Sequence, residues 1–240
     1  MLKPQVFANH EAVSRHAADW IVNQLRKEPS ALLCLACGTT PMRTYQLLAE
    51  QGAREPELFA KCRVIKLDEW GGLPPGDTAT CEAQLRSTLI EPLRLHEQYV
   101  SFNGQSEDPK AECARISSWL LHHGPIDTCV LGLGVNGHIG FNEPDTFLEP
   151  HAHVAPLSQA SLEHAMLRQT THRPTYGLTL GMADLLQSRH VLLLVTGSTK
   201  REPLRRLLTG AITTDFPGSL LQLHQNTVVL YDAAANPTEQ

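Results

Sequence analysis

The sequence predicts an α/β protein, a single-domain three-layer α/β/α sandwich built on a mostly parallel, Rossmann-like sheet. Short apolar or β-branched runs, each bounded by turn residues, alternate with longer stretches whose apolar residues recur at helical spacing. This alternation is typical of βαβ units, in which helices cover both faces of a parallel sheet. Glycine and proline punctuate the chain without gathering in one linker, and no repeat is visible, so one domain over residues 1–240 is expected.

The strands and helices follow from these patterns in chain order. Apolar residues recur with helical spacing from the first helix onward, and Pro29 follows that helix. Helices are expected at residues 10–26, 41–51, 79–90, 109–121, 158–169, 182–187 and 198–208. The strands are apolar almost throughout, as strands buried on both faces are, and are expected at residues 31–36, 63–67, 128–133, 190–196 and 227–231. Residues 176–180 are a further strand candidate.

Composition excludes several classes of protein. The chain has 42% hydrophobic and 19% charged residues, unlike collagen-like, coiled-coil or disordered sequences. Its net charge of −5 lacks the basic excess expected for binding nucleic acid or an anionic membrane. No apolar run approaches the roughly 18 residues of a membrane helix, and the start shows no secretory signal. We therefore expect a cytoplasmic protein with neither a nucleic-acid nor a membrane partner.

The cysteines and histidines do not form a recognisable metal motif. The 6 cysteines are scattered through a chain too large to need disulfides, which suits a reducing compartment. Cys34 and Cys37 form C-x-x-C, a redox signal, but their apolar context favours packing. There is no H-E-x-x-H, and no second ligand pair follows at zinc spacing, so no metal site is predicted.

Ligands of open parallel sheets bind beyond the carboxyl ends of the strands, so the functional residues are expected in the loops that follow the strands. After residues 31–36 come Gly38, Thr39 and Thr40 at the start of a helix, a candidate anion cradle. An ordinary N-capping threonine is the alternative. A second such loop, residues 196–200, adds hydroxyl groups and the cation of Lys200, which suits phosphate, although a solvated lysine is equally common there.

The two other loops carry groups that transfer protons. Asp68 and Glu69 follow residues 63–67, and a neighbouring charge or partial burial raises a carboxyl pKa toward that of a useful base. A solvated turn is the alternative. Residues 132–144 contain G-x-G-x-x-G, but no helix pattern follows, so a dinucleotide site is not expected. This loop instead presents His138, Asn142 and Glu143, a histidine beside a carboxylate that suits proton transfer, unless His138 is only a turn residue.

Taken together, the four loops resemble the glucosamine-6-phosphate deaminase family, in the same order along the chain. The similarity runs from about residue 31 to residue 231. The Gly-His-Ile-Gly-Phe-Asn-Glu-Pro segment is highly specific, and residues 66–72, 78–82 and 192–197 look closest to the galactosamine-6-phosphate deaminase/isomerase branch. The segments that carry the resemblance are Leu-Ala-Cys-Gly-Thr-Thr-Pro-Met at 35–42, Lys-Leu-Asp-Glu-Trp at 66–70, Leu-Gly-Leu-Gly-Val-Asn-Gly-His-Ile-Gly-Phe-Asn-Glu-Pro at 131–144 and Gly-Ser-Thr-Lys at 197–200.

The resemblance implies an aldose–ketose isomerisation with loss of ammonia, acting on a 2-amino-2-deoxyhexose 6-phosphate without metal or other cofactor. Galactosamine 6-phosphate is the favoured substrate and glucosamine 6-phosphate the other. Asp68 would move the C2 proton, while His138, with Glu143 and Asn136, would open the sugar ring. The resemblance implies substrate contacts at Gly38, Thr39, Thr40, Glu69, Gly137, Arg168 and Lys200, with Arg173 as a competitor of Arg168.

Two departures and two alternatives qualify what the resemblance implies. Many relatives have aspartate where this chain has Asn136, which cannot ionise, and exchange to aspartate is expected to be tolerated. The serine pair of allosteric relatives is replaced here by Asp145 and Thr146, so activation by an N-acetylated sugar phosphate is not expected. The alternatives are a 6-phosphogluconolactonase, whose relatives show Asp-Glu-Arg instead of residues 68–70, and a catalytically inactive sugar-phosphate-binding regulator. Assembly into a homo-oligomer stays open.

Overall fold

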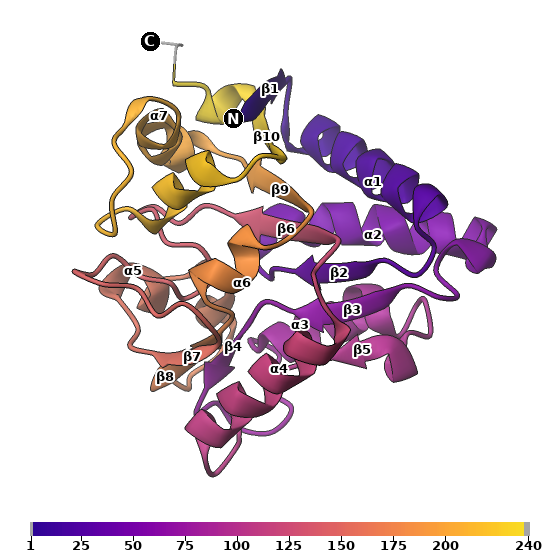
Figure 1. Cartoon of the computed structure of the whole chain (residues 1–240), viewed down its shortest axis with the longest axis horizontal. Helices are drawn as coiled ribbons and strands as arrows, with labels where there is room; N and C mark the ends of the chain where they lie inside the picture. The colour runs from indigo at the N-terminus through magenta and orange to yellow at the C-terminus, as the bar shows by residue number, and fades with distance from the viewer. Residues whose placement is uncertain (1, 238–240) are drawn as a thin grey trace.

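Seven parallel strands form the central sheet, in the order β1-β10-β9-β6-β2-β3-β5 (Figure 1). The structure is a computed structural model that describes residues 2–237, apart from the side chain of Gln169. The strands are β1 (Lys3–Phe7), β2 (Leu32–Leu35), β3 (Arg63–Lys66), β5 (Tyr99–Val100), β6 (Thr128–Gly132), β9 (His190–Val195) and β10 (Thr227–Asp232).

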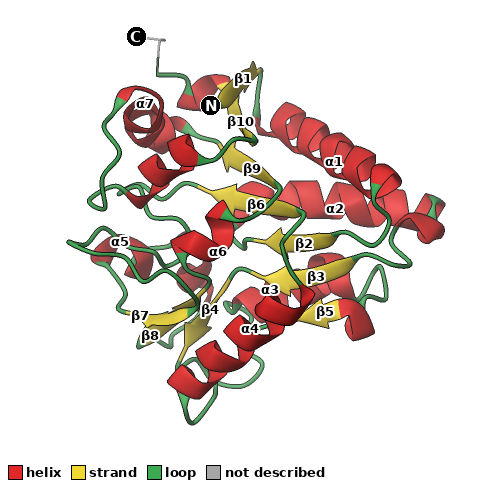
Figure 2. Ribbon diagram, viewed as in Figure 1, coloured by secondary structure: helices red, strands yellow, loops and turns green. Residues whose placement is uncertain are grey.

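Helices cover both faces of this sheet, as Figure 2 shows. Successive side chains of a strand point to opposite faces, so Leu33 and Leu35 of β2 pack in one core cluster, and Leu32 and Cys34 in the other. The first cluster contains α1 (His10–Lys27) and α2 (Thr39–Arg54). The second contains α4 (Pro109–His123), α6 (Met182–Leu186) and α7 (Arg201–Thr209). The predicted three-layer α/β/α architecture with a mostly parallel sheet is therefore confirmed.

Local signals in the sequence explain where the long helices begin. The side chain of Asn9 accepts a hydrogen bond from the amide of Ala12 and caps α1. Asp108 caps α4 in the same way, and Pro109 occupies the first helical position, where its missing N–H costs nothing. The buried side chains of α1 include Val13, Ala17 and Ile21, spaced four apart on the face toward the sheet.

A second, antiparallel sheet lies beyond the carboxyl ends of the central strands (Figure 1). It consists of β4 (Asp68–Gly71), β8 (Tyr176–Thr179) and β7 (His153–Ala155). In the register of β4 with β8, Asp68 lies opposite Thr179. The predicted strand at 176–180 is thus present but belongs to this smaller sheet, and residues 68–71, expected to lie in a loop, are a strand that pairs with it.

The five predicted central strands are present within one or two residues of their expected bounds, and two predicted helices are broken. Residues 79–90 form α3 (Cys81–Leu85) followed by a π-helical turn at Arg86–Ile90. Residues 158–169 form α5 (Gln159–Leu162) and then a 3₁₀ segment at Ala165–Gln169. His164 separates these two, because its Nδ1 accepts from the amide of Met166 and caps a new turn. In the described residues 2–237, no helix is both long enough and apolar enough to cross a membrane.

Besides β4, three strands escaped sequence prediction because they are short or exposed. β1 is an edge strand that contains Pro4 and has mostly exposed side chains, so it shows no buried apolar run. β5 has only two residues and β7 three. Such segments carry too few positions for either the alternating or the continuous apolar pattern to be recognised.

Candidate active site

All four loops singled out in the sequence leave the carboxyl ends of parallel strands and meet at one edge of the sheet. In Figure 1, α5, β7 and β8 lie beyond the arrowheads of β2 and β6. The loops after β2 and β9 touch directly, since the hydroxyl oxygens of Thr40 and Thr196 are 3.5 Å apart. Cys37, from the loop after β2, lies beside Asp68 at the start of β4. Tertiary structure therefore assembles a shared surface from segments that are far apart in sequence.

The amino end of α2 is built to receive an anion. Gly38 has a φ of +111°, a conformation that favours glycine, and it supplies no capping side chain. The amide of Gly38 donates to Gln84 Oε1 at 2.6 Å. Among residues 2–237, no side chain accepts a hydrogen bond from the amides of Thr39 and Thr40 in the first turn of the helix. The 16-residue helix adds the positive end of its dipole at this point.

Lys200 brings a cation to the same edge. It ends the 3₁₀ turn that follows β9, and that turn is held by the amide of Gly197, which donates to Asp232 at 3.0 Å. The Lys200 side chain is half-buried, and burial lowers its pKa. Among residues 2–237, its ammonium group makes no ion pair or side-chain hydrogen bond. A partly desolvated cation with no partner of its own is well suited to bind a phosphate.

Asp68 is a buried carboxyl group whose pKa lies close to neutral pH. Its residue is only 9% exposed, and burial raises its pKa to about 7, helped by the negative charge of Glu69 and opposed by Lys66. Apart from the thiol of Cys81, whose Sγ is 3.8 Å from Oδ1, no side chain donates to it among the described residues. Such a group can both accept and return a proton at pH 7.

Beneath Asp68 lies a buried ion-pair cluster that sequence analysis missed. Lys66 is fully buried, and its Nζ is 2.6 Å from Glu69 Oε2 and 2.8 Å from Glu82 Oε2. Burial would lower the pKa of Lys66, but the two carboxylates raise it above its ordinary value. The sequence signal was a lysine set between Ile65 and Leu67 in a predicted buried strand, a place where a lysine rarely occurs unless its charge is paired.

The cluster corrects the expectation that Glu69 contacts the substrate. Besides Lys66, its carboxylate accepts from the backbone amides of Trp70, Cys81 and Glu82 at 2.7–3.0 Å. These four donors occupy both oxygens, and the residue is 2% exposed. Glu69 therefore ties β4 to the start of α3 and holds negative charge beside Asp68, and no oxygen is left for a ligand.

His138 lies in a hydrogen-bonded group with Glu143 and Asn136, here called the His138 relay. Its Nδ1 is 3.2 Å from Glu143 Oε2, which also accepts from Asn136 Nδ2 at 2.9 Å. The hydroxyl of Ser161, in α5, donates to the other oxygen of Glu143. Burial would raise the pKa of Glu143, but His138, Ser161 and Asn136 lower it to about 2. With the carboxylate on Nδ1, the Nε2 atom of His138 is the one left to exchange a proton with a ligand.

Glycine residues are required around His138 for steric reasons. A Cβ at Gly134 would lie 2.4 Å from the His138 ring. Gly137 has a φ of +91°, and a Cβ there would lie 2.0 Å from the Phe216 ring. The side chain of Asn142 is 1% exposed and donates to the carbonyls of Ile139 and Leu180, so it anchors the loop rather than facing a ligand.

The contact between Asn136 and Glu143 changes what is expected of an aspartate at position 136. Asn136 donates to a carboxylate, so Asn136→Asp places two carboxyl groups in contact, and one must keep a proton to a higher pH than in the unfolded chain. Stability present at low pH is then lost as the pH rises through that raised pKa. We expect Asn136→Asp to lose about 2 kcal/mol at pH 8 and much less at pH 5, measured by urea denaturation.

The matched control for this variant is Asn103→Asp, because the Asn103 side chain accepts a hydrogen bond from the amide of Gln105. An aspartate can keep that bond, so little change is expected at either pH. If Asn136→Asp were as stable as the parent protein at pH 8, the donor role of Asn136 would be refuted, and the tolerance expected from sequence alone would stand.

His164 is a further site residue that sequence analysis did not find. Its ring lies 3.5 Å from where a Cβ of Gly38 would be, and its centroid is 6.2 Å from that of Trp70. Burial lowers its pKa to about 4, and the charges of His138 and Lys200 lower it further. His164 is thus a neutral imidazole at pH 7. It lies beside Gly38 of the anion cradle and close enough to His138 and Lys200 for their charges to lower its pKa. Its only sequence context was a segment predicted to be a continuous helix.

Arg168 lies at the margin of this assembly. It lines a groove of about 340 Å³ together with His164 and Arg173. The side chain of Arg168 is exposed, whereas Arg173 donates to the carbonyl of Leu162 at 3.4 Å. Both arginines therefore share a groove that reaches the site through His164, and the substrate contact expected of Arg168 stays a prediction.

Similarity to known proteins covers nearly the whole chain. Residues 8–230 match the family described as glucosamine-6-phosphate isomerases/6-phosphogluconolactonase. The chain is 39% identical over 227 residues to "Putative deaminase AgaI" of Escherichia coli (strain K12), covering 94% of this chain and 90% of that protein. It is 35% identical over 238 residues to a glucosamine-6-phosphate deaminase of Geobacillus sp. (strain WCH70), covering 95% and 92%.

Solved structures give the same picture of the fold. A monomeric glucosamine-6-phosphate deaminase of the NagB superfamily superimposes with a TM-score of 0.92 at 33% identity, covering 97% of this chain and 98% of that one. A 6-phosphogluconolactonase from Trypanosoma brucei has a TM-score of 0.79 at 19% identity, covering 98% of this chain and 97% of that one. At this identity, the similarity shows only that the fold is shared. On this family match and these identities, the chain belongs to the glucosamine-6-phosphate isomerase/6-phosphogluconolactonase family.

Proposed function

We propose that this protein converts a 2-amino-2-deoxyhexose 6-phosphate into the corresponding ketose 6-phosphate and ammonia. The observation that carries the proposal is Asp68, a buried carboxyl group with a pKa raised to about 7 at the sheet edge that also holds an unpaired cation. Relatives named as glucosamine-6-phosphate deaminases, 29–35% identical over most of their length, support this reaction. A lactonase has no need of a base that takes a proton from carbon.

The phosphate is expected to bind at the amino end of α2 and against Lys200. The free amides of Thr39 and Thr40, the helix dipole and the ammonium group all favour a dianion there. Holding the far end of the sugar in this way places C1 and C2 near Asp68 and the ring oxygen near His138. Binding energy from the phosphate thus contributes to the positioning of the reacting carbons.

The reaction then needs two residues that move protons. One opens the sugar ring, and the other transfers a proton from C2 to C1. His138 moves a proton between the anomeric hydroxyl and the ring oxygen, which opens the ring to the aldehyde, while Glu143 stabilises the charged imidazole. Asp68 removes the C2 proton, and the electron pair forms the C1–C2 double bond. The π electrons of the C1 carbonyl move to its oxygen, which takes a proton from water, so the product is an enolamine with a hydroxyl on C1. Asp68 returns the proton to C1, which leaves an iminium group at C2. Water adds to C2, and ammonia leaves as the ketone forms.

Galactosamine 6-phosphate is the proposed preferred substrate, and glucosamine 6-phosphate a second one. The basis is the sequence similarity of residues 66–72 and 192–197 to the galactosamine branch of the family. The six cysteines are all free thiols, which suits action in the reducing cytoplasm. One family member is a monomeric deaminase, so a single chain of this fold can be active. Assembly of this chain into a homo-oligomer is tested by measuring its molecular mass in solution.

The test is the release of ammonia from galactosamine 6-phosphate and from glucosamine 6-phosphate, each with the ketose phosphate quantified in parallel. Equimolar ammonia and ketose phosphate are expected, with the higher kcat/KM for the galactosamine compound. Hydrolysis of 6-phosphogluconolactone without ammonia release would instead assign the lactonase reaction. Binding of either amino sugar phosphate without turnover would identify a regulator. The unphosphorylated amino sugars are the control, because they lack the group that Lys200 is expected to hold.

A further inference from the structure

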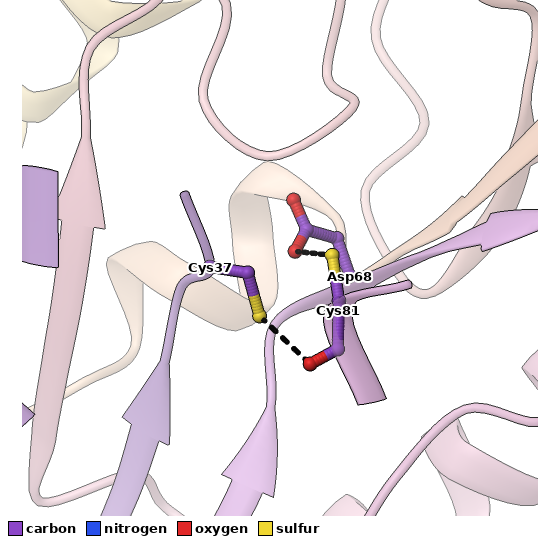
Figure 3. Close-up of side chains that lie close together, drawn as sticks. All are labelled: Cys37, Asp68 and Cys81. Carbon is purple, nitrogen blue, oxygen red and sulfur yellow. Dashed lines mark hydrogen bonds between the residues drawn. The ribbon is translucent and has the colours of Figure 1, made fainter. Parts of the chain in front are cut away.

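The proposed catalytic base, Asp68, forms a cluster with two cysteines, Cys37 and Cys81, that the proposed reaction does not use. Figure 3 shows Cys37, Asp68 and Cys81 converging from the loop after β2, the start of β4 and the first residue of α3. One ligand atom from each lies within 4.8 Å of the others. Cys81 and Asp68 are buried, and Cys37 is partly exposed, so the cluster can be reached from outside.

We propose that Cys37, Asp68 and Cys81 bind a soft divalent cation, zinc in particular, and that this cation reversibly blocks Asp68. The inference that the cation inhibits rests on the function proposed above, whereas binding itself does not. Zinc takes sulfur at about 2.3 Å and carboxylate oxygen at about 2.0–2.2 Å, which separates tetrahedral ligand atoms by about 3.5–3.8 Å. The Sγ of Cys81 already lies 3.8 Å from Asp68 Oδ1, so these two need hardly move.

The third ligand atom, the Sγ of Cys37, lies within 4.8 Å of the other two. The Cys37 thiol donates to the carbonyl of Cys81 at 3.5 Å, and a thiol is a weak donor, so this hydrogen bond can be exchanged for a metal–sulfur bond. Two thiolates and a carboxylate select zinc or cadmium over magnesium or calcium, which prefer oxygen. Lys66 does not compete with the cation for the Asp68 carboxylate, since its ammonium group is paired with Glu69 and Glu82.

The C-x-x-C motif is not the origin of this site. Cys34 is fully buried in the core on the opposite face of β2, among residues such as Ile65 and Cys129. The partner of Cys37 is instead Cys81, 44 positions away. The fourth tetrahedral position then falls to water or a bound sugar, as in zinc sites with three protein ligands. A cation held there uses the Asp68 lone pair that proton abstraction requires.

Cadmium titration of the reduced, chelator-treated full chain tests the binding. We expect the ultraviolet thiolate-to-cadmium charge-transfer band to saturate at one cation per chain. Cys37→Ser and Cys81→Ser are each expected to weaken binding at least about tenfold. Cys113→Ser is the control, since this thiol lies outside the cluster, on the buried face of α4, and its loss should leave the band unchanged. Far-ultraviolet circular dichroism verifies that each variant is folded.

Absence of the band in the parent protein, or an unchanged band in the Cys37→Ser/Cys81→Ser double variant, would overturn the site. In the ammonia assay, zinc is expected to inhibit the parent protein, a chelator to restore it, and Cys37→Ser to resist zinc relative to its own zinc-free rate. Equal zinc inhibition of Cys37→Ser would overturn the link to Asp68. If the parent protein releases no ammonia, the proposed function fails, yet the cadmium band still decides the binding site.

Discussion

Asp68→Asn is expected to reduce kcat for ammonia release by about 10³-fold, within the range attributed to a positioned general base. The amide keeps the shape of the side chain but cannot accept the C2 proton. Since the proposed phosphate site lies elsewhere, at α2 and Lys200, KM should change by less than about threefold. Steady-state kinetics on the preferred amino sugar phosphate, with solvent deuterium incorporation at C1 as a second readout, measures both effects.

The pH profile separates this role from a structural one. Because burial raises the pKa of Asp68 to about 7, kcat/KM of the parent protein should fall below pH 7 as the base becomes protonated. The same raised pKa means that ionising Asp68 costs stability as the pH rises through 7. Asp68→Asn should therefore melt higher than the parent at pH 8, with the difference shrinking toward pH 5. Deuterium uptake at the parent rate in the variant would exclude Asp68 as the base.

Lys66→Met is expected to lower the free energy of unfolding by about 3–5 kcal/mol, the cost of leaving a buried charge without its partner. Lys66 is fully buried, and Glu69 is 2% exposed, so the carboxylate cannot turn to water. The methionine fills similar volume, which limits any loss from a cavity. Urea denaturation followed by circular dichroism at pH 7 measures the change.

A second variant keeps this prediction testable if Lys66→Met does not fold. Lys66→Met combined with Glu69→Gln removes the two fully buried charges of the cluster and leaves only the more exposed Glu82, so the double variant should recover part of the lost stability. Lys110→Met is the control, because Lys110 is exposed at the start of α4 and makes no ion pair among the described residues. A loss below about 1 kcal/mol for Lys66→Met would show that the cluster is solvated like a surface pair.

Sequence alone predicted where the four loops of the candidate site begin, because each strand end and turn is a local feature. A buried strand, a turn and a helix start are read from neighbouring residues, and parallel strands necessarily present their carboxyl ends at one edge. His138 and Glu143 are five positions apart and meet within one glycine-rich loop, as predicted. The pairing of Ser161 with Glu143 spans 18 positions and depends on where α5 docks, which no spacing rule encodes.

The errors arise where long-range contacts override a local pattern. Residues 158–169 have helical spacing, but the side chain of His164 caps a new turn and breaks the helix. Residues 68–71 contain polar and glycine residues typical of a turn, yet pairing with β8 makes them a strand. The resemblance implied a substrate contact for Glu69, but adjacent residues of a strand point to opposite sides, and Glu69 points to Lys66 instead.

The amino-acid sequence by itself determined the α/β architecture, the family and the four loops that carry the reactive groups, because strand, turn and helix-cap signals act over a few residues. Only the tertiary structure decided that Lys66 and Glu69 form a buried pair, that His164 joins the site, and that Cys37 meets Cys81 beside Asp68. The physical reason is that burial, and with it pKa and ligand geometry, depends on which distant segments exclude water from a side chain.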